Sequence, residues 1–434
     1  MFGRLNRQQD LVKSILTLFT GSAIAQAIPL LVSPILTRIY PVVDFATLTI
    51  SMTLISLVGV VVTGRYEFAI GLPKDDEQGR GLMQITLIST FIIAGVVSLF
   101  LLMFHGYVAS WIAFPDSSWY LFVVPLAALF YGSYQAYSMW QLRQRNYMAI
   151  SGSRISQSLT NSGFSLGLFY TGFGLNGLVI GNLLGHMAAF SHVFFATKNR
   201  IHGFISTPVK GLRTLAAKYS DMPRVNSIHA LSDVAQNTAV ILMITGFFGS
   251  VSTGLYGLTI RIMQAPLNML GNSMAMVFYK EVAEKKVHGH KIAKLLISTM
   301  KTLLLLSTPI FLVIMVFGPD LFGLIFGSEW REAGDYARIL SPWLFLNFIA
   351  SPLSNLPLIL NKQRIFFLYS MIGNGMVILS LALSGWLMND IKSGLMVLSA
   401  VQCCFQTAMI LFFIKIAREA DKSVHDSEES SSSV

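Results

Sequence analysis

Charged residues are scarce in this sequence of 434 residues: Asp, Glu, Lys and Arg together make up 12%. A water-soluble domain carries about 25% charged residues, because its folded surface has to face water. Hydrophobic residues reach 53%, and the mean hydropathy is +0.62. This shortage of charge excludes an ordinary soluble globular protein and indicates a chain embedded in a membrane.

Cysteine is equally scarce, and the sequence lacks the motifs of common enzymes. Cys403 and Cys404 are adjacent in an apolar run, which favours a role as small hydrophobic residues. There is no Cys/His spacing typical of a metal site and no glycine-rich loop of the kind that binds ATP phosphates. We therefore expect no resident metal or cofactor and no enzymatic activity.

Long apolar stretches are what the sequence does contain. A membrane-spanning helix needs about 20 apolar residues to cross a hydrocarbon core about 30 Å thick. Twelve segments meet this requirement, near 15–37, 45–64, 82–104, 119–140, 147–170, 174–197, 225–247, 252–278, 295–317, 338–360, 366–388 and 394–416. The first imitates a secretory signal peptide, but its apolar run continues to Leu36, so we interpret it as an uncleaved helix.

The basic residues are distributed unevenly between these segments. With the N-terminus inside, 24 of the 31 Lys and Arg residues fall in inner segments and four in outer ones. Cytoplasmic loops of membrane proteins carry this excess of positive charge. The pattern predicts that both termini are cytoplasmic, and it explains the net charge of +10 without a nucleic-acid partner.

The longest inner loop divides the chain almost midway. We expect an N-terminal six-helix lobe at 1–197, a cytoplasmic linker at 198–224, a C-terminal six-helix lobe at 225–416 and a disordered cytoplasmic tail at 417–434. A faint repeat at an offset of 208 residues relates the segment beginning at Asp44 to the one beginning at Ser252. Two halves of the same orientation are typical of parallel repeats in transporters.

Polar residues inside the spans are the candidate functional residues. An Arg or Asp near the bilayer centre costs about 2.5–3.5 kcal/mol, so it persists only beside protein, water or a ligand. Helical spacing aligns His229, Asp233, Gln236 and Asn237 in the seventh span, Arg261, Gln264, Asn268 and Asn272 in the eighth, and Arg154, Gln157, Ser158 and Asn161 in the fifth. These stripes predict a shared hydrated cavity. Hydrogen bonding between helices is the alternative for any single Ser or Asn. Snorkelling is the alternative for Arg154, and structural pairing with Asp233 is the alternative for Arg261.

Several stretches resemble one known family. They are Ser33-Pro34-Ile35-Leu36-Thr37-Arg38-Ile39-Tyr40-Pro41 with Asp44-Phe45, Arg65 to Lys74, Gly254-Leu255-Tyr256 through Arg261 and Pro266, and Phe326 to Trp330 with Ala333-Gly334. In this order they resemble the polysaccharide flippases of the O-antigen type in the MOP exporter superfamily. Ala46 departs from the glycine that the family commonly has there.

This resemblance implies an all-α integral membrane fold of about twelve helices in two six-helix lobes, MATE-like and V-shaped, that works by alternating access. It implies an undecaprenyl-pyrophosphate-linked oligosaccharide as cargo, a bacterial inner membrane as location, and polysaccharide polymerase and chain-length proteins as partners. Carried over to this chain, it places in the cavity Gln26, Arg38, Thr49, Thr53, His229, Asp233, Arg261 and Gln264, beside Arg154 and Asn268 from the stripes. Arg65 and Glu67 of the first inner loop are the expected cytoplasmic gate.

We expect the pyrophosphate to bind Arg261, helped by Arg154 or Arg38, because Arg grips phosphate in a bidentate manner. Asp233 would tune this site, and coupling to protons, sodium or the membrane potential stays open. Two alternatives to a flippase remain at this point. One is a drug or metabolite antiporter of the same superfamily, and the other is a non-transport membrane enzyme or scaffold of polysaccharide assembly.

Overall fold

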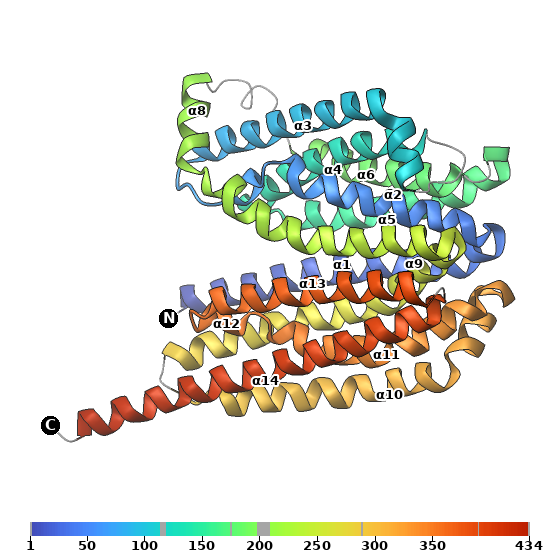
Figure 1. Cartoon of the computed structure of the whole chain (residues 1–434). Coiled ribbons are helices and arrows are strands. Elements are labelled where there is room, and N and C mark those ends of the chain that lie inside the picture. The colour runs from blue at the N-terminus through green and yellow to red at the C-terminus, as the bar shows by residue number, and fades with distance from the viewer. Residues whose placement is uncertain are drawn as a thin grey trace. The chain divides into compact units, whose positions relative to one another are not determined.

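The computed structural model describes residues 2–112, 119–173, 176–197, 209–287, 290–388 and 390–432, and all regular structure in these ranges is helical (Figure 1). The first helices are α1 (Phe2–Ile39), α2 (Val42–Val62), η1 (Tyr66–Ala69), α3 (Asp76–Trp111), α4 (Tyr120–Arg143), α5 (Tyr147–Leu168), η2 (Phe169–Phe173), α6 (Asn176–Ala196), α8 (Val209–Lys218) and η3 (Met222–Asn226). They are followed by α9 (Ser227–Val287), α10 (Ala293–Phe326), η4 (Ser328–Trp330), α11 (Arg331–Ala350), η5 (Ser351–Leu353), α12 (Leu356–Ile359), α13 (Gln363–Leu387) and α14 (Ile391–Ser432).

In the part of the chain that the structure describes, each predicted span overlaps helical structure, and the expected all-α membrane fold of about twelve helices is confirmed. Within the described ranges, nine helices are long and apolar enough to cross a membrane. Among these, α9 is continuous through two predicted spans, with non-helical backbone at Gly249 (φ +84°) marking the boundary between them. The predicted spans on α4 and α5 fall outside the nine; α5 is rich in Ser, Asn and Gln.

The chain divides into two compact units, Met1–Gly254 and Leu255–Val434. This division lies after the linker at 198–224 that the sequence predicts as the boundary, so the first half of α9 belongs to the first unit. Gly254, the last residue of the first unit, packs directly on the backbone carbonyl of Val42 at the start of α2. A side chain at Gly254 would collide with that carbonyl. The part of the linker at 198–208 lies outside the described residues.

Small residues set the packing of the first unit. Gly21 of α1 lies against Ser151 of α5, and Gly181 of α6 lies against Ser165 of α5. Close approach of this kind is typical of membrane helices, where lipid supplies no hydrophobic drive for association and van der Waals packing has to do so. The α5 helix is therefore held between α1 and α6, which fixes the direction of its polar side chains.

The helices of the second unit are held together by a similar close contact and by hydrogen bonds between side chains. Gly318 of α10 and Gly334 of α11 approach so closely that neither position has room for a side chain. The Gln406 side-chain amide of α14 donates to the Asn347 side chain of α11 at 3.2 Å. A buried apolar cluster that includes Phe278, Leu296, Leu353 and Phe413 fills the end of this unit.

The end of α14 differs from the disordered tail that the sequence predicts from residue 417. Ala417 is fully buried, and the helical backbone continues to Ser432. The Asp421 carboxylate accepts hydrogen bonds from the backbone amides of Ile292 and Ala293, at 2.6 and 3.1 Å. These amides belong to the start of α10, where a helix has unsatisfied N–H groups and a partial positive charge. Asp421 therefore ties the last helix to α10.

We predict that Asp421→Ala lowers the free energy of unfolding by about 1 kcal/mol, the typical cost of losing a carboxylate that caps a helix. Thermal unfolding of the purified protein in detergent measures the loss. Glu419→Ala is the matched control, since Glu419 forms only an exposed ion pair with Lys362 at 3.9 Å, worth less than about 0.5 kcal/mol. Equal losses in the two variants would contradict the capping role.

Candidate functional site

Arg154 of α5 lies against α1. Its guanidinium donates to the Ser22 hydroxyl, and one turn further along α5 the Ser158 hydroxyl donates to the Ala25 carbonyl at 2.6 Å. Gln26, half-buried, follows Ser22 by one turn of α1. The structure thus places two of the predicted cavity residues, Arg154 and Gln26, on the same stretch of the α1–α5 pair. Ser22 carries no sequence signal of this role, because serine is common throughout the spans.

Arg38 does not join this group. It is exposed near the end of α1 and donates to the Pro34 carbonyl at 3.3 Å. Sixteen residues separate Ser22 from Arg38, which corresponds to about 24 Å along a helix. A single phosphate group therefore cannot contact Arg38 and Arg154 together on this helix pair. Thr49 and Thr53 of α2 donate their hydroxyls to carbonyls of their own helix.

The first half of α9 presents polar side chains on one face. Asp233 and Asn237 are both exposed, and the Asn237 amide donates to the Asp233 carbonyl oxygen at 3.2 Å. Gln236 beside them is half-buried. The side chain of His229, predicted on the same stripe, lies outside what the structure describes.

The second half of α9 carries Arg261 and Gln264, both half-buried within the span. No described carboxylate of the second unit forms an ion pair with Arg261. The Thr259 hydroxyl donates to the Ala333 carbonyl of α11 at 2.9 Å, which fixes this part of α9. Gln264 follows Arg261 by about one turn, so the two side chains share a helix face. The Asn268 side chain, predicted on the same face, lies outside the described residues.

Arg65 and Glu67 occupy a tight turn between α2 and α3. Gly64 and Arg65 both have left-handed backbone, with φ +58° and +59°. Glu67 is only 2% exposed, and its carboxylate lies 3.8 Å from the Arg65 guanidinium. Burial raises the pKa of Glu67, while a hydrogen bond from Thr63 and the charge of Arg65 partly oppose the rise. Their role as a gate stays a prediction.

This turn is held in place by α4. Arg143 donates to the carbonyls of Ile70 and Pro73, at 3.1 and 2.7 Å, and pairs with Asp76 at 2.9 Å. Tyr131, also on α4, is close enough to Glu67 to interact with its charge. Because left-handed backbone is unfavourable for residues other than glycine, Arg65 keeps its conformation only through such surroundings.

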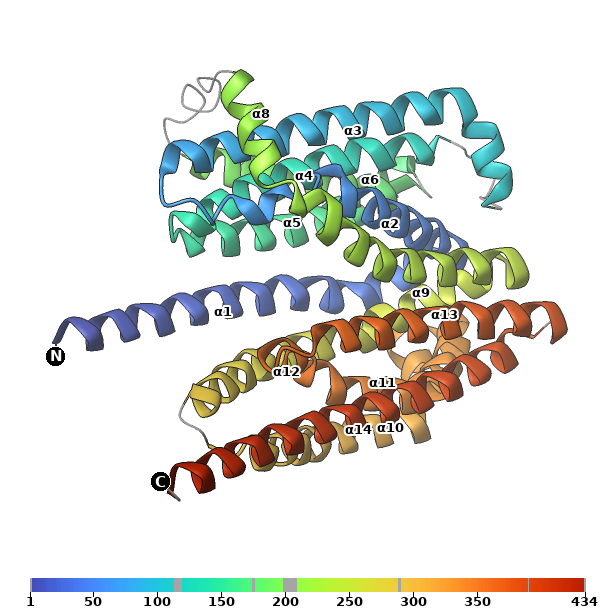
Figure 2. The ribbon, with the colours of Figure 1, turned by 60° about the vertical axis from the view of Figure 1, so that its left-hand side comes forward.

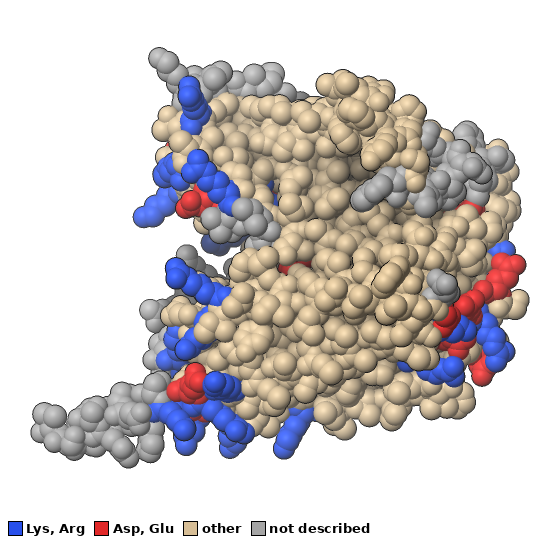
Figure 3. All heavy atoms as spheres, in the orientation of Figure 1, with Lys and Arg blue, Asp and Glu red and all other residues tan. Residues whose placement is uncertain are grey.

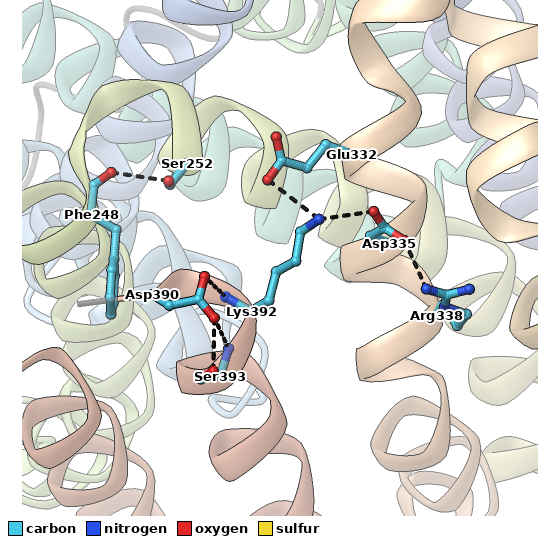
Figure 4. Close-up of polar contacts among 8 residues, drawn as sticks. All are labelled: Phe248, Ser252, Glu332, Asp335, Arg338, Asp390, Lys392 and Ser393. Atoms are coloured by element: carbon cyan, nitrogen blue, oxygen red, sulfur yellow. Dashed lines mark hydrogen bonds and ion pairs between the residues drawn. The ribbon is translucent and has the colours of Figure 1, made fainter. Parts of the chain in front are cut away.

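A second charged group, which the sequence does not predict, joins α11 to α14 (Figure 4). Lys392 reaches between Glu332 and Asp335, with its amino group 3.8 and 3.0 Å from their carboxylates. Asp335 also pairs with Arg338 at 2.9 Å. Hydrogen bonds from Ser393 hold the pKa of Asp390 below its ordinary value. We interpret this group as a contact that holds the ends of α11 and α14 together, because its charged side chains pair with one another.

The distribution of charge over the surface agrees with a membrane-embedded protein. On the face that Figure 3 shows, Lys, Arg, Asp and Glu gather at the helix ends and a mostly uncharged band lies between them. Large apolar side chains are exposed along the long helices, for example Leu305 on α10 and Leu102 on α3. Within the described residues, no three His, Cys, Asp or Glu side chains are placed to hold a metal ion.

We predict that Glu67→Gln changes how stability depends on pH. Burial raises the pKa of folded Glu67 above its ordinary 4.5, so the folded protein binds the proton more tightly than the unfolded chain. The resulting stabilisation is complete below the unfolded pKa and is lost as pH rises through the folded pKa. The unfolding temperature of the wild-type protein should therefore fall with rising pH relative to that of Glu67→Gln.

Glu77→Gln is the control for this measurement, because Glu77 is an exposed carboxylate at the start of α3. It should leave the pH profile of the unfolding temperature unchanged. Parallel profiles for the wild-type protein and Glu67→Gln would show that Glu67 keeps an ordinary pKa.

Comparison with solved structures identifies the fold. The chain is similar to a multidrug resistance MATE family transporter of the MOP superfamily in an inward-facing conformation, with a TM-score of 0.63 and 13% identity over 94% of this chain and 95% of that one. A MOP superfamily transporter from Pyrococcus furiosus gives a TM-score of 0.62 at 13% identity, over 95% and 96%. The Vibrio cholerae MATE transporter VcmN gives 0.56 at 14% identity, over 95% and 97%.

Among proteins of curated function, none matches the sequence closely enough to count as a relative. The profile of one sequence family, described as Polysaccharide biosynthesis protein, matches residues 35–335. That range holds the α1–α2 turn, the Arg65–Glu67 turn and the second half of α9, which carry the resemblance found in the sequence. The resemblance is thereby confirmed: this chain belongs to the polysaccharide biosynthesis protein family and has the fold of the MOP superfamily of membrane transporters.

Proposed function

We propose that this protein is a flippase that moves an undecaprenyl-pyrophosphate-linked oligosaccharide from the cytoplasmic to the periplasmic leaflet of a bacterial inner membrane. The cargo would be the repeat unit of an O-antigen, a capsule or an exopolysaccharide. The observation that carries the proposal is the combination of a polysaccharide biosynthesis family with a transporter fold. Family and fold point to a transporter rather than an enzyme. A transporter in such a pathway has an intermediate to move across the membrane.

The chemistry of this cargo explains why polar residues are needed inside the protein. A polyprenyl tail can stay in the hydrocarbon of the bilayer during transfer. Only the pyrophosphate and the sugars have to cross, and without a polar path they would lose their hydration at high cost. The protein therefore has to offer cations to the phosphates and hydrogen-bonding groups to the sugars.

Arg261 is the best candidate for the phosphate contact. A cation inside a span is expensive unless a partner compensates its charge, and no described carboxylate of its own unit pairs with Arg261. A pyrophosphate would supply the missing negative charge, and a guanidinium can bind it through two parallel hydrogen bonds. Gln264 on the same face can donate a further hydrogen bond.

The α1–α5 pair offers a surface suited to sugars. Ser22, Ser158, Gln26 and Arg154 place two hydroxyls, an amide and a guanidinium along one stretch of these helices. Such groups bind sugar hydroxyls without demanding one stereochemistry. Arg38, at the far end of α1, would meet the cargo at a different stage of its passage.

The direction of transport follows from the charge of the cargo. Pyrophosphate carries negative charge outward, which an inside-negative membrane potential favours by about 2.3 kcal/mol per charge per 100 mV. Asp233, exposed on the first half of α9, would tune the affinity for the anionic head. Polymerase and chain-length proteins would receive the flipped unit at the outer surface.

We predict that Arg261→Ala lowers the amount of surface polysaccharide about 10- to 100-fold, the loss expected when a hydrogen bond to a charged group is removed. The measurement is surface glycan per cell in a strain that carries the variant as its only copy, at equal levels of membrane-inserted protein. Arg261→Lys keeps the charge but not the bidentate grip, so it should lie between Ala and wild type.

Arg331→Ala is the control for this experiment, because Arg331 is an exposed arginine that pairs with Asp320 at 2.7 Å near a helix end. It should leave surface polysaccharide at the wild-type level. Normal polysaccharide in Arg261→Ala cells would remove Arg261 from the mechanism. Normal polysaccharide after deletion of the whole gene, with lost resistance to a cationic drug, would favour the antiporter instead.

A further inference from the structure

The short helix α8 takes no part in the proposed transport path, and its orientation sets it apart. Figures 1 and 2 both show α8 crossing the end of α3 at a steep angle, while the long helices of the first unit run alongside one another. Since the long helices span the bilayer, a helix that crosses their ends lies along the membrane surface.

One face of α8 is docked on the protein. Leu212, Leu215 and Ala216 pack against a buried cluster that includes Leu82 of α3 and Trp140 of α4. The Ala216 carbonyl also accepts a hydrogen bond from the Tyr66 hydroxyl at 3.2 Å. Apolar packing and this bond fix the rotation of α8 about its own axis, so the direction of its other face is fixed as well.

The other face of α8 is exposed and cationic. Arg213 and Lys218 are exposed, and neither forms an ion pair with another described residue. The helix contains no acidic residue, and its sequence adds Lys210. Acidic residues occur on the segments around α8: Glu67 follows Tyr66, Asp75, Asp76 and Glu77 lie at the start of α3, and Asp221 follows α8. Asp76 among them is already paired with Arg143.

We propose that α8 is an in-plane helix that binds the phosphate headgroups of anionic phospholipids through Arg213 and Lys218. Headgroup phosphates are the anions present at the level where spanning helices leave the hydrocarbon. A helix with one apolar and one basic face is suited to this position, and each cation near an anionic membrane surface strengthens binding about five-fold. This inference is independent of the cargo and goes beyond the proposed function.

The turn at Arg65 and Glu67 connects α8, where the lipid would bind, to the rest of the first unit. Tyr66 lies between these two residues, and its hydroxyl is the group that bonds to α8. Arg224, exposed in η3 after α8, is close enough to Tyr66 to interact electrostatically. A lipid bound at Arg213 and Lys218 would therefore be linked to the predicted gate through the hydrogen bond between Tyr66 and α8.

Native mass spectrometry of the purified full-length protein tests the proposal. The protein in detergent is titrated with phosphatidylglycerol or, separately, with phosphatidylcholine, and bound lipids are counted. The wild-type protein should retain phosphatidylglycerol in preference, less so at high ionic strength. In Arg213→Gln/Lys218→Gln, the affinity for phosphatidylglycerol should fall about five-fold for each cation removed, while phosphatidylcholine binding stays unchanged.

Two further variants make the test specific. Lys294→Gln/Lys301→Gln removes the same charge from exposed lysines of α10 and should bind phosphatidylglycerol like wild type. Arg213→Lys/Lys218→Arg keeps both charges and should do the same. Undiminished binding in the α8 double variant would overturn the proposal, as would an equal loss in the α10 variant. An unchanged unfolding temperature in detergent without added lipid shows that the α8 variant is folded.

Discussion

The cost of placing polar groups in hydrocarbon governs this structure. The spans satisfy their backbone groups by forming helices, and most of their hydroxyls bond to a carbonyl one turn earlier, as Thr86 and Thr90 do in α3. Hydrogen-bonded in this way, serine and threonine side chains cost little free energy inside the membrane. Arg261 cannot be neutralised in this way, since a guanidinium carries five donors and a full charge. A chain that keeps it inside a span has a use for it, and the proposed phosphate contact of Arg261 rests on that inference.

Close packing of small residues makes such placement possible. Where Gly21 meets Ser151 and Gly318 meets Gly334, helix backbones approach without intervening side chains. These contacts fix the rotation of each helix, and with it the direction of its polar stripe. Charged residues, by contrast, tie the helix ends, as Lys392 does between α11 and α14 and Arg143 does at the turn after α2. The spans are thus positioned by shape and their ends by charge.

Much of the fold could be predicted from the sequence, because hydropathy and the roughly 20-residue requirement act on each span separately. The candidate site was less predictable, since it depends on which helices become neighbours. The stripe on α5 predicted a polar face, but only the packing of α5 on α1 shows that Arg154 meets Ser22 and not Arg38. The role of Asp421 escaped prediction for the same reason. The composition of its segment is that of a polar tail. Its partners Ile292 and Ala293 lie far away in sequence, so no local pattern indicates the contact.

The most direct test of the transport account uses the purified protein in liposomes that contain a fluorescent polyprenyl-pyrophosphate oligosaccharide in both leaflets. A membrane-impermeant glycosidase added outside can cleave only the sugars of the outer leaflet. If the protein is a flippase, the cleaved share rises beyond the outer-leaflet fraction, because inner-leaflet cargo is brought outward as cleavage proceeds. A cleaved share that stays at the outer-leaflet fraction, identical to that of protein-free liposomes, would contradict the account.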